Sequence, residues 1–342
     1  MRILFIIIIV SIVIAFNLNA QDSISKNKKN YIDERYIEKY KNIPAVYLSE
    51  YNKYNYFSIV DLDSGLTLKY KPNVALSIGP GFGYKWFGID LSFFSVGRKS
   101  ESIYGKTQKF DIQTHLYLKR FIADFVFQSY QGFYHDTLKL KDSTQIILQH
   151  TTIRPDIRMA SIGGTIMYFT NYKKFSFKST FSQTEFQKKS AGTWAFGLNF
   201  HYFGITGDSS LINQSYKAYF DSSTYYKSIY TSNWGIIGGY FHTFTLHRWF
   251  TTLSLLVGFN GKKELFTLED DIVQRDTINL STKLELRLGL GYNANRVYFG
   301  INFVGDSFIY SKSTQEYGTV RLYLGYRFSP KLVKNETSKS NF

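Results

Sequence analysis

The stretch LSTKLELRLGLGYNANRVYFGINF, residues 280–303, alternates apolar and polar side chains on both sides of a short polar turn. Before the turn, a leucine occupies nearly every second position, and Lys283, Glu285 and Arg287 stand singly between them. Because successive side chains of a β-strand point to opposite faces, this pattern predicts a strand with one apolar and one charged face. The alternation resumes after the turn, from Tyr298 to Phe303, so the stretch predicts a β-hairpin.

The same two-residue period recurs along most of the chain. Clear examples are FGIDLSFF (87–94), FDIQTHLYLK (110–119), FSFKSTFS (175–182), WAFGLNFHY (194–202) and TVRLYLGYRF (319–328). Further strands are predicted near 57–70, 74–84, 121–134, 157–170, 234–246 and 249–259. Short turns alternate with longer polar loops, and this arrangement is typical of outer-membrane barrels, where the short turns are periplasmic.

The direction of the strands sets their expected number. If 171–174 and 246–248 are both short turns at the same rim, the strand at 175–182 runs away from that rim. The strands at 194–206 and 234–246 then both run toward it. One more strand is then expected between them, near Tyr216–Phe220. The pattern predicts an all-β, antiparallel transmembrane barrel of about 12–14 strands.

The N-terminal residues have the composition of a secretory signal peptide. One Arg precedes an apolar stretch from Ile3 to Phe16, and Leu18-Asn19-Ala20 follows it closely. We expect a signal peptide over 1–20, cleaved after Ala20. An uncleaved anchor helix is the alternative, although the apolar stretch is shorter than the roughly 20 residues that span a bilayer.

Three further segments follow from composition. Residues 21–53 are predicted to form a polar periplasmic leader, with one short helix at 31–42. Residues 54–328 form the predicted barrel, and residues 329–342 form a polar tail. A tail after the last strand departs from the usual ending of such barrels, in which an aromatic residue is the last one.

Bulk composition excludes several classes of protein. The chain has no Cys, so neither disulfides nor thiolate metal sites can contribute to its stability. The formal net charge is +15, with 41 Lys and Arg against 26 Asp and Glu. An exported chain without a recognisable binding motif is not expected to bind nucleic acid. Membrane lipids, the export machinery and the barrel-assembly machinery are the expected partners.

Alternation alone does not separate a membrane barrel from two packed soluble sheets. Three features favour the membrane: the large strand number, a polar face with glycines and charges of both signs, and aromatic residues near strand ends. The tryptophans predicted to form an interfacial girdle are Trp86, Trp194, Trp234 and Trp249. The cell outer membrane is therefore the predicted location.

The polar faces of the strands predict a charged, net basic lumen. The residues expected to face it are Asp111, His115, Lys178, His201, Lys283, Glu285, Arg287, Arg321 and Arg327. On the lipid side, each basic residue would cost roughly 2–4 kcal/mol at mid-membrane.

Candidate chemistry on the polar face is sparse. His115 and Asp111 share one face of a strand, and Ser92 or Ser161 could supply a nucleophile, with Asp90 and Asp124 on nearby strands. A hydrogen-bonded network that fills the lumen is the simpler interpretation of the same residues. The six His are dispersed, so neither a metal nor a cofactor is predicted.

Four stretches carry a family resemblance: KYKPN (69–73), GFGYKWFGIDLSF (81–93), NYKKFSF (171–177) and QKKSAGTW (187–194). In this order, the chain resembles the Bacteroidota outer-membrane family catalogued as domain of unknown function 4421, over most of 55–328. The resemblance implies an outer-membrane barrel in a Gram-negative bacterium and implies no activity.

Three functions remain open at this point. The first is a structural or pore-like barrel, either a narrow pore that favours anions or a barrel closed by paired charges and tyrosines. The second is a barrel enzyme, a lipid or peptide hydrolase or acyltransferase, with His115 and Asp111 in its lumen. The third is a surface protein that binds through its long loops.

Overall fold

The computed structural model describes residues 32–40, 43–61, 64–84, 87–90, 94–136, 138–140, 146–148, 151–275, 278–310 and 312–328. The predicted signal peptide, residues 21–31 and 41–42 of the predicted leader, Trp86 and the predicted tail lie outside the described residues.

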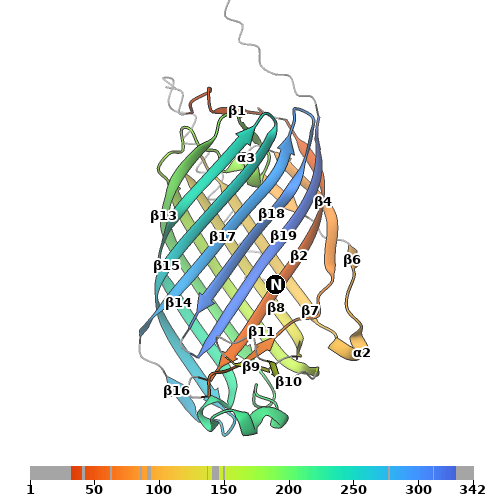
Figure 1. Cartoon of the computed structure of the whole chain (residues 1–342), viewed down its shortest axis with the longest axis vertical. Helices are drawn as coiled ribbons and strands as arrows, with labels where there is room; N and C mark the ends of the chain where they lie inside the picture. Colours follow the sequence, from red (N-terminus) through yellow and green to blue (C-terminus); the bar gives the residue numbers. More distant parts are fainter. Residues whose placement is uncertain are drawn as a thin grey trace, which may run out of the picture. The chain divides into compact units, whose positions relative to one another are not determined.

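The long strands form one antiparallel sheet that closes into a barrel (Figure 1). In wall order they are β2 (Ala45–Val60), β4 (Leu76–Tyr84), β5 (Phe87–Asp90) with β6 (Phe94–Val96), β7 (Gln108–Tyr117), β8 (Phe121–His135), β11 (Thr152–Phe169), β13 (Ala191–Thr206), β14 (Tyr226–Leu246), β15 (Trp249–Leu268), β17 (Asn279–Asn293), β18 (Val297–Ile309) and β19 (Ser313–Arg327). When β5 and β6 are counted as one span, these described wall strands number twelve, within the predicted range.

Shorter elements extend the sheet or lie at the ends of the barrel. The strands β3 (Leu66–Tyr70), β9 (Leu138–Leu140), β10 (Ile146–Leu148) and β16 (Val273–Arg275) belong to the same sheet, whereas β1 (Ile37–Lys39) pairs with β12 (Glu185–Gln187). The helical elements are α2 (Glu101–Tyr104), α3 (Lys178–Phe181), η2 (Gln214–Tyr219) and η3 (Ser222–Thr224).

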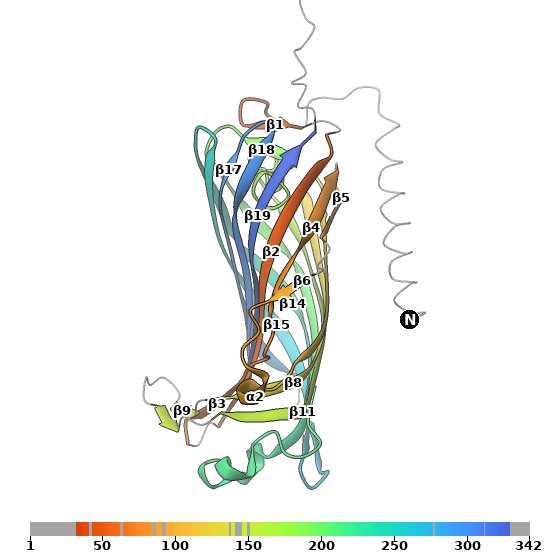
Figure 2. The ribbon, with the colours of Figure 1, turned by 90° about the vertical axis from the view of Figure 1, so that its right-hand side faces the viewer.

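The first and last wall strands pair with each other. β19 lies antiparallel to β2 from the pair Ser313 and Ile59 to the pair Arg327 and Ala45 (Figure 2). The short turns predicted near 119–120, 246–248 and 293–295 join neighbouring strands at one rim, the turn end, at the top of Figure 1. The opposite rim, the loop end, carries the longer connections.

Side chains alternate between the two faces of the wall as the sequence predicts. In β17, Leu286 is 38% exposed, whereas its neighbours Glu285 and Arg287 are 1% and 4% exposed. The exposed apolar side chains of the wall strands form a belt, here called the apolar band. Its members include Phe196 and Leu198 of β13, Ile236 of β14, Leu253 and Leu255 of β15, Leu290 of β17 and Leu324 of β19.

Two of the predicted strands are described in the structure as helical segments, so both predictions were wrong. Residues 175–182 contain α3 instead of a strand, and residues near Tyr216–Phe220 form η2. The errors are linked, because the false strand at 175–182 reversed the expected direction of 194–206. In the structure β13 pairs directly with β14, so no further strand is needed between them.

The start of the barrel also differs from the prediction. Its first strand, β2, begins at Ala45 and ends at Val60, whereas residue 54 was expected. The predicted strand at 57–70 is divided, since β3 folds back on the end of β2. Within the predicted helix at 31–42, residues 37–39 form β1.

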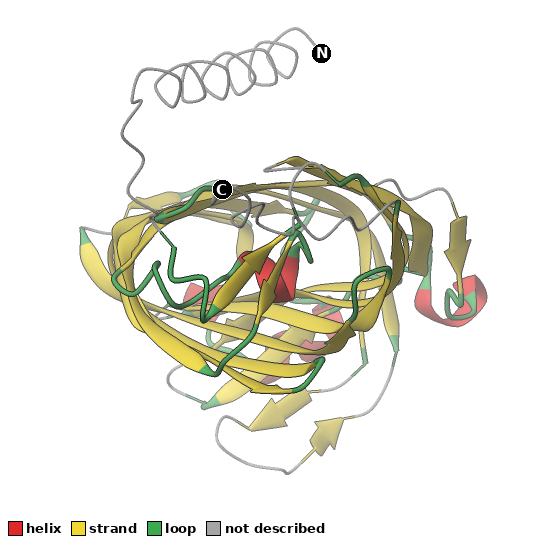
Figure 3. Ribbon diagram, turned by 90° about the horizontal axis from the view of Figure 1, so that it is seen from above, coloured by secondary structure: helices red, strands yellow, loops and turns green. Residues whose placement is uncertain are grey.

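Both ends of the barrel interior are filled by apolar side chains. At the turn end, residues 171–190, here called the plug, fold inward; Phe175, Phe177 and Phe181 pack near Phe169 of β11 and Phe241 of β14. Figure 3 shows a short helix inside the ring of strands.

At the loop end, residues 207–225, here called the cap, close the interior in a similar way. Leu211, Ile212, Tyr216 and Phe220 join a buried apolar cluster with inward side chains of several wall strands. The strand residues of this cluster include Phe57, Met159, Phe203, Ile229 and Phe266. The interior is therefore apolar at this end, where the lumen of a water-filled barrel would be polar.

Among the described residues, no helix is both long enough and apolar enough to cross a bilayer.

Candidate functional site

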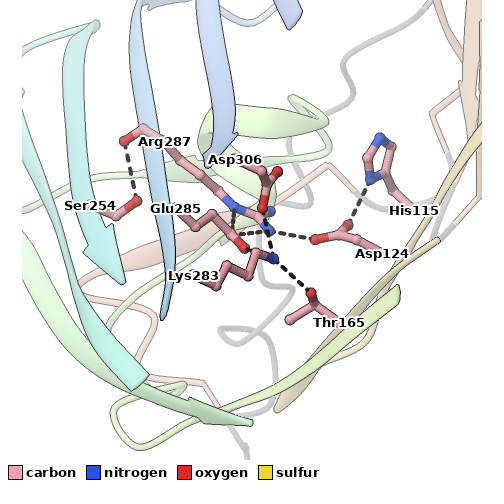
Figure 4. A network of polar contacts seen from close by, with 8 residues as sticks. All are labelled: His115, Asp124, Thr165, Ser254, Lys283, Glu285, Arg287 and Asp306. Atoms are coloured by element: carbon pink, nitrogen blue, oxygen red, sulfur yellow. Dashed lines mark hydrogen bonds and ion pairs between the residues drawn. The ribbon is translucent and has the colours of Figure 1, made fainter. Parts of the chain in front are cut away.

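Six titratable side chains meet between the plug and the cap, and we call them the ionic layer (Figure 4). They come from four wall strands: His115 of β7, Asp124 of β8, Lys283, Glu285 and Arg287 of β17, and Asp306 of β18. Alternation places the three β17 residues on one face because they are two positions apart.

Short contacts link all six side chains. Arg287 contacts Asp124 at 2.6 Å and Glu285 at 2.5 Å. Lys283 contacts Glu285 at 2.8 Å and Asp306 at 2.7 Å. His115 Nδ1 lies 2.6 Å from Asp124 Oδ1, and a carboxylate can only accept, so this nitrogen donates. The Lys283 ammonium also donates to Thr165 Oγ1 at 3.3 Å.

The contact between Arg287 and Asp124 crosses the barrel. β8 and β17 are not neighbours in the wall, so their side chains can meet only through the interior. Charges removed from water are stable in such a place only when they are paired and hydrogen-bonded. The ionic layer has both signs in it, so its charge is largely neutralised internally.

Arg321 and Arg327 hold the plug. Arg327 donates to the carbonyl oxygens of Gln183 at 2.5 Å and Ala294 at 2.6 Å. Arg321 donates to the carbonyl oxygen of Phe181 at 3.4 Å. Both guanidinium groups also lie over tyrosine rings, for example Tyr298 for Arg327, at 4.3 Å. Lys178 belongs to the plug itself, on α3, and not to a wall strand.

Further contacts fix the plug against the wall. Thr180 Oγ1 lies 2.6 Å from Thr252 Oγ1, and the Asn302 amide donates to the Thr180 carbonyl at 3.3 Å. The backbone of Gly289 allows this approach, since a Cβ there would stand 2.3 Å from Thr180 Cγ2. The Phe177 ring lies 5.5 Å from the Arg287 guanidinium, so the plug also touches the ionic layer.

Asp111 and His201 lie apart from this layer. Asp111 pairs with Lys53 of β2 at 2.9 Å and accepts from Gln128 and Tyr130 at 3.0 Å each. His201 is buried and stacks on Phe308 at 4.3 Å between ring centroids. Its two ring nitrogens make no hydrogen bond to any described residue.

The structure does not assemble the candidate catalytic triad among its described residues. His115 pairs with Asp124 and not with Asp111. Ser161 donates to Gln128 at 3.3 Å and stands opposite it in the wall, four register positions away from the Asp124–Thr165 pair. The side chains of Asp90 and Ser92 lie outside the description.

The described tryptophans are exposed on the outer surface. Trp194 begins the apolar band of β13, Trp249 is the first residue of β15, and both lie near the turn end. Trp234 stands inside β14 and not at its end, because that strand begins eight residues earlier, at Tyr226. It is level with Phe200 of β13.

Two members of the ionic layer, Asp124 and Asp306, are not among the lumen-facing residues that the sequence predicts. Asp124 appears there only as a candidate for catalysis, and Asp306 does not appear. A signal existed for Asp306, which is buried like its β18 neighbours Phe308 and Asn302, on the polar side of the alternation. Its contact with Lys283 depends on the β17–β18 register, which the sequence does not specify.

A closed antiparallel barrel with an apolar outer belt and buried ion pairs defines a transmembrane β-barrel of the cell outer membrane. The chain belongs to the family described as domain of unknown function DUF4421, whose model matches residues 31–328.

Solved structures similar to the chain include three outer-membrane proteins. The outer membrane protease OmpT from Escherichia coli is 10% identical, with 84% of this chain and 97% of that chain covered and a TM-score of 0.36. The transport unit of the autotransporter AIDA-I from Escherichia coli is 9% identical, with 92% of this chain and 97% of that chain covered and a TM-score of 0.30. The translocator domain of the autotransporter NalP from Neisseria meningitidis is 8% identical, with 93% of this chain and 96% of that chain covered and a TM-score of 0.31. TM-scores this low carry no argument about function. No curated protein matches the chain.

Proposed function

We propose that this protein is a structural outer-membrane barrel that is closed at rest. Its own side chains fill the lumen in three levels: the plug, the ionic layer and the cap. The observation that carries the proposal is the ion pair between Arg287 and Asp124, which joins two non-neighbouring strands across the interior at 2.6 Å.

The plug supports the same proposal at the turn end. It is anchored to two wall strands that are not neighbours, by Arg327 of β19 and by Thr252 of β15. A segment tied to several strands resists displacement, because all of its contacts must break together. Steady conduction therefore requires a rearrangement of residues 171–190.

The ion preference of a barrel without its plug follows from the same contacts. The ionic layer is paired internally, whereas Arg321 and Arg327 donate to carbonyl oxygens of the plug. If the plug left the barrel, these two guanidinium groups would face water without those acceptors. An opened barrel would therefore favour anions, as the net basic lumen expected from sequence implies.

Planar-bilayer recording of the refolded protein tests this proposal. We expect no steady current from the wild-type barrel. A variant in which short Gly-Ser turns replace residues 172–189 and 209–223, and in which Arg287→Met and Asp124→Asn also remove the ion pair across the lumen, serves as the positive control, and we expect it to conduct with a preference for anions. Steady wild-type conductance would contradict a closed barrel, and a silent but folded control variant would contradict closure by these segments.

A further inference from the structure

One strand of the wall departs from the apolar band. On β2, the outward positions begin with Val46 and Leu48, which are exposed, and continue with Glu50 and Asn52. Glu50 is half-buried and Asn52 is exposed. On β13, at the opposite side of the wall, the outward positions from Trp194 to Tyr202 are all apolar.

Glu50 lies well inside the band and not at its edge. It is five residues from Ala45, at the turn-end start of β2. With about 3.3 Å per residue and a strand tilt of about 40°, this places it about 13 Å from the rim, roughly halfway across a band about 25 Å tall. Among the described side chains of the apolar band, it is the only carboxyl group.

The described residues around Glu50 offer its carboxyl group no partner. Its register neighbours are Leu322 of β19 and Ile78 of β4. No hydrogen bond or ion pair joins it to the described residues. It also lines a shallow outer groove of about 510 Å³, between Leu48, Leu322 and Ile301 and floored by Gly291 and Gly300.

An acyl chain cannot satisfy this carboxyl group, since hydrocarbon has no hydrogen-bond donor. Ionisable groups at this depth normally face protein or water. A protein occupant of this face must therefore bring a donor to Glu50. Asn52, two positions along the same strand face, carries a donor of that kind.

We propose that the outer face of β2 is the contact surface of a homodimer, with Glu50 of each copy accepting a hydrogen bond from Asn52 of the other copy. A two-fold axis along the membrane normal brings each residue of the pair to its counterpart, as an isologous contact requires. Because both β2 strands are tilted, they cross at a single point. Two residues that are neighbours on one strand face, Glu50 and Asn52, are therefore enough to form the polar contact. The exposed side chains of Leu48 and Leu324, 57% and 58% exposed, supply ridges beside the groove.

Cross-linking in membranes tests the surface. The chain has no Cys, so single cysteines report one position each. We expect Leu48→Cys to give a cross-linked dimer with a short bis-maleimide, and Leu198→Cys, 66% exposed on the opposite side, to give none. Equal cross-linking of the two variants would indicate random collision and overturn the proposal, as would the absence of any dimer.

Sedimentation equilibrium in detergent tests the two polar residues. Loss of two symmetric hydrogen bonds corresponds to roughly a tenfold weaker association, which we expect for Glu50→Leu. Glu50→Gln keeps an acceptor and should retain the dimer, and Thr251→Leu, elsewhere in the band, is the matched control. A monomeric wild-type protein, or a Glu50→Leu dimer of unchanged affinity, would overturn the proposal.

Discussion

The ionic layer joins carboxylate, ammonium, guanidinium and imidazole side chains in one network inside the barrel. Two-residue alternation is enough to put Lys283, Glu285 and Arg287 on one face, and the structure buries all three. The partners on other strands could not be predicted. Asp124 is separated from Arg287 by 163 positions, and which residues meet across a lumen depends on the stagger and diameter of the whole barrel.

Replacing Arg287 should destabilise the barrel strongly. The substitution Arg287→Met leaves Asp124 and Glu285 buried without their shared guanidinium, and removing one partner of a buried pair costs about 3–5 kcal/mol. Urea unfolding of the refolded barrel in lipid vesicles measures this change. The double variant Arg287→Met with Asp124→Asn should recover part of the loss, and equal stability of Arg287→Met and wild type would argue against a stabilising network.

Strands were easier to predict than the segments inside the barrel. The hairpin at 280–303 has one apolar and one charged face, and the structure forms it as β17 and β18 with the expected turn. The stretch 175–182 also alternates, but its phenylalanines pack on Phe169 and Phe241 in the interior and not on lipid. Alternation reports which side chains avoid water, and it does not say whether lipid or protein covers them.

The plug should be loosened by a change in the wall that faces it. Gly289→Leu would drive a side chain into Thr180, whose Cγ2 lies 2.3 Å from the position of a Cβ. We expect a cysteine at buried Ser179 to react with a water-soluble maleimide at least tenfold faster in this background. Gly261→Leu is the control, because its Cβ would make only ordinary contacts, and equal labelling in both backgrounds would contradict the packing of the plug.

At the scale of the whole molecule, the polarity of the interior changes along the axis. The interior is apolar at the plug and at the cap, and charged between them, whereas the outer wall at the level of the charges is apolar. Sequence alone predicted the barrel and its approximate strand number. It did not predict closure at both ends, because the alternation at 175–182 in the plug predicts a wall strand and the cap has no periodic pattern.

Side chains that follow one another along a wall strand alternate between the lipid and the closed interior of the barrel. Spin labels at Leu255, which is exposed, and at its buried neighbour Ser254 test this claim most directly in lipid vesicles. We expect lipid-dissolved oxygen to accelerate the relaxation of the label at 255, which a water-soluble nickel complex does not reach, and we expect the label at 254 to be shielded from that oxygen. Equal oxygen access at the two positions, or the reverse order, would contradict it.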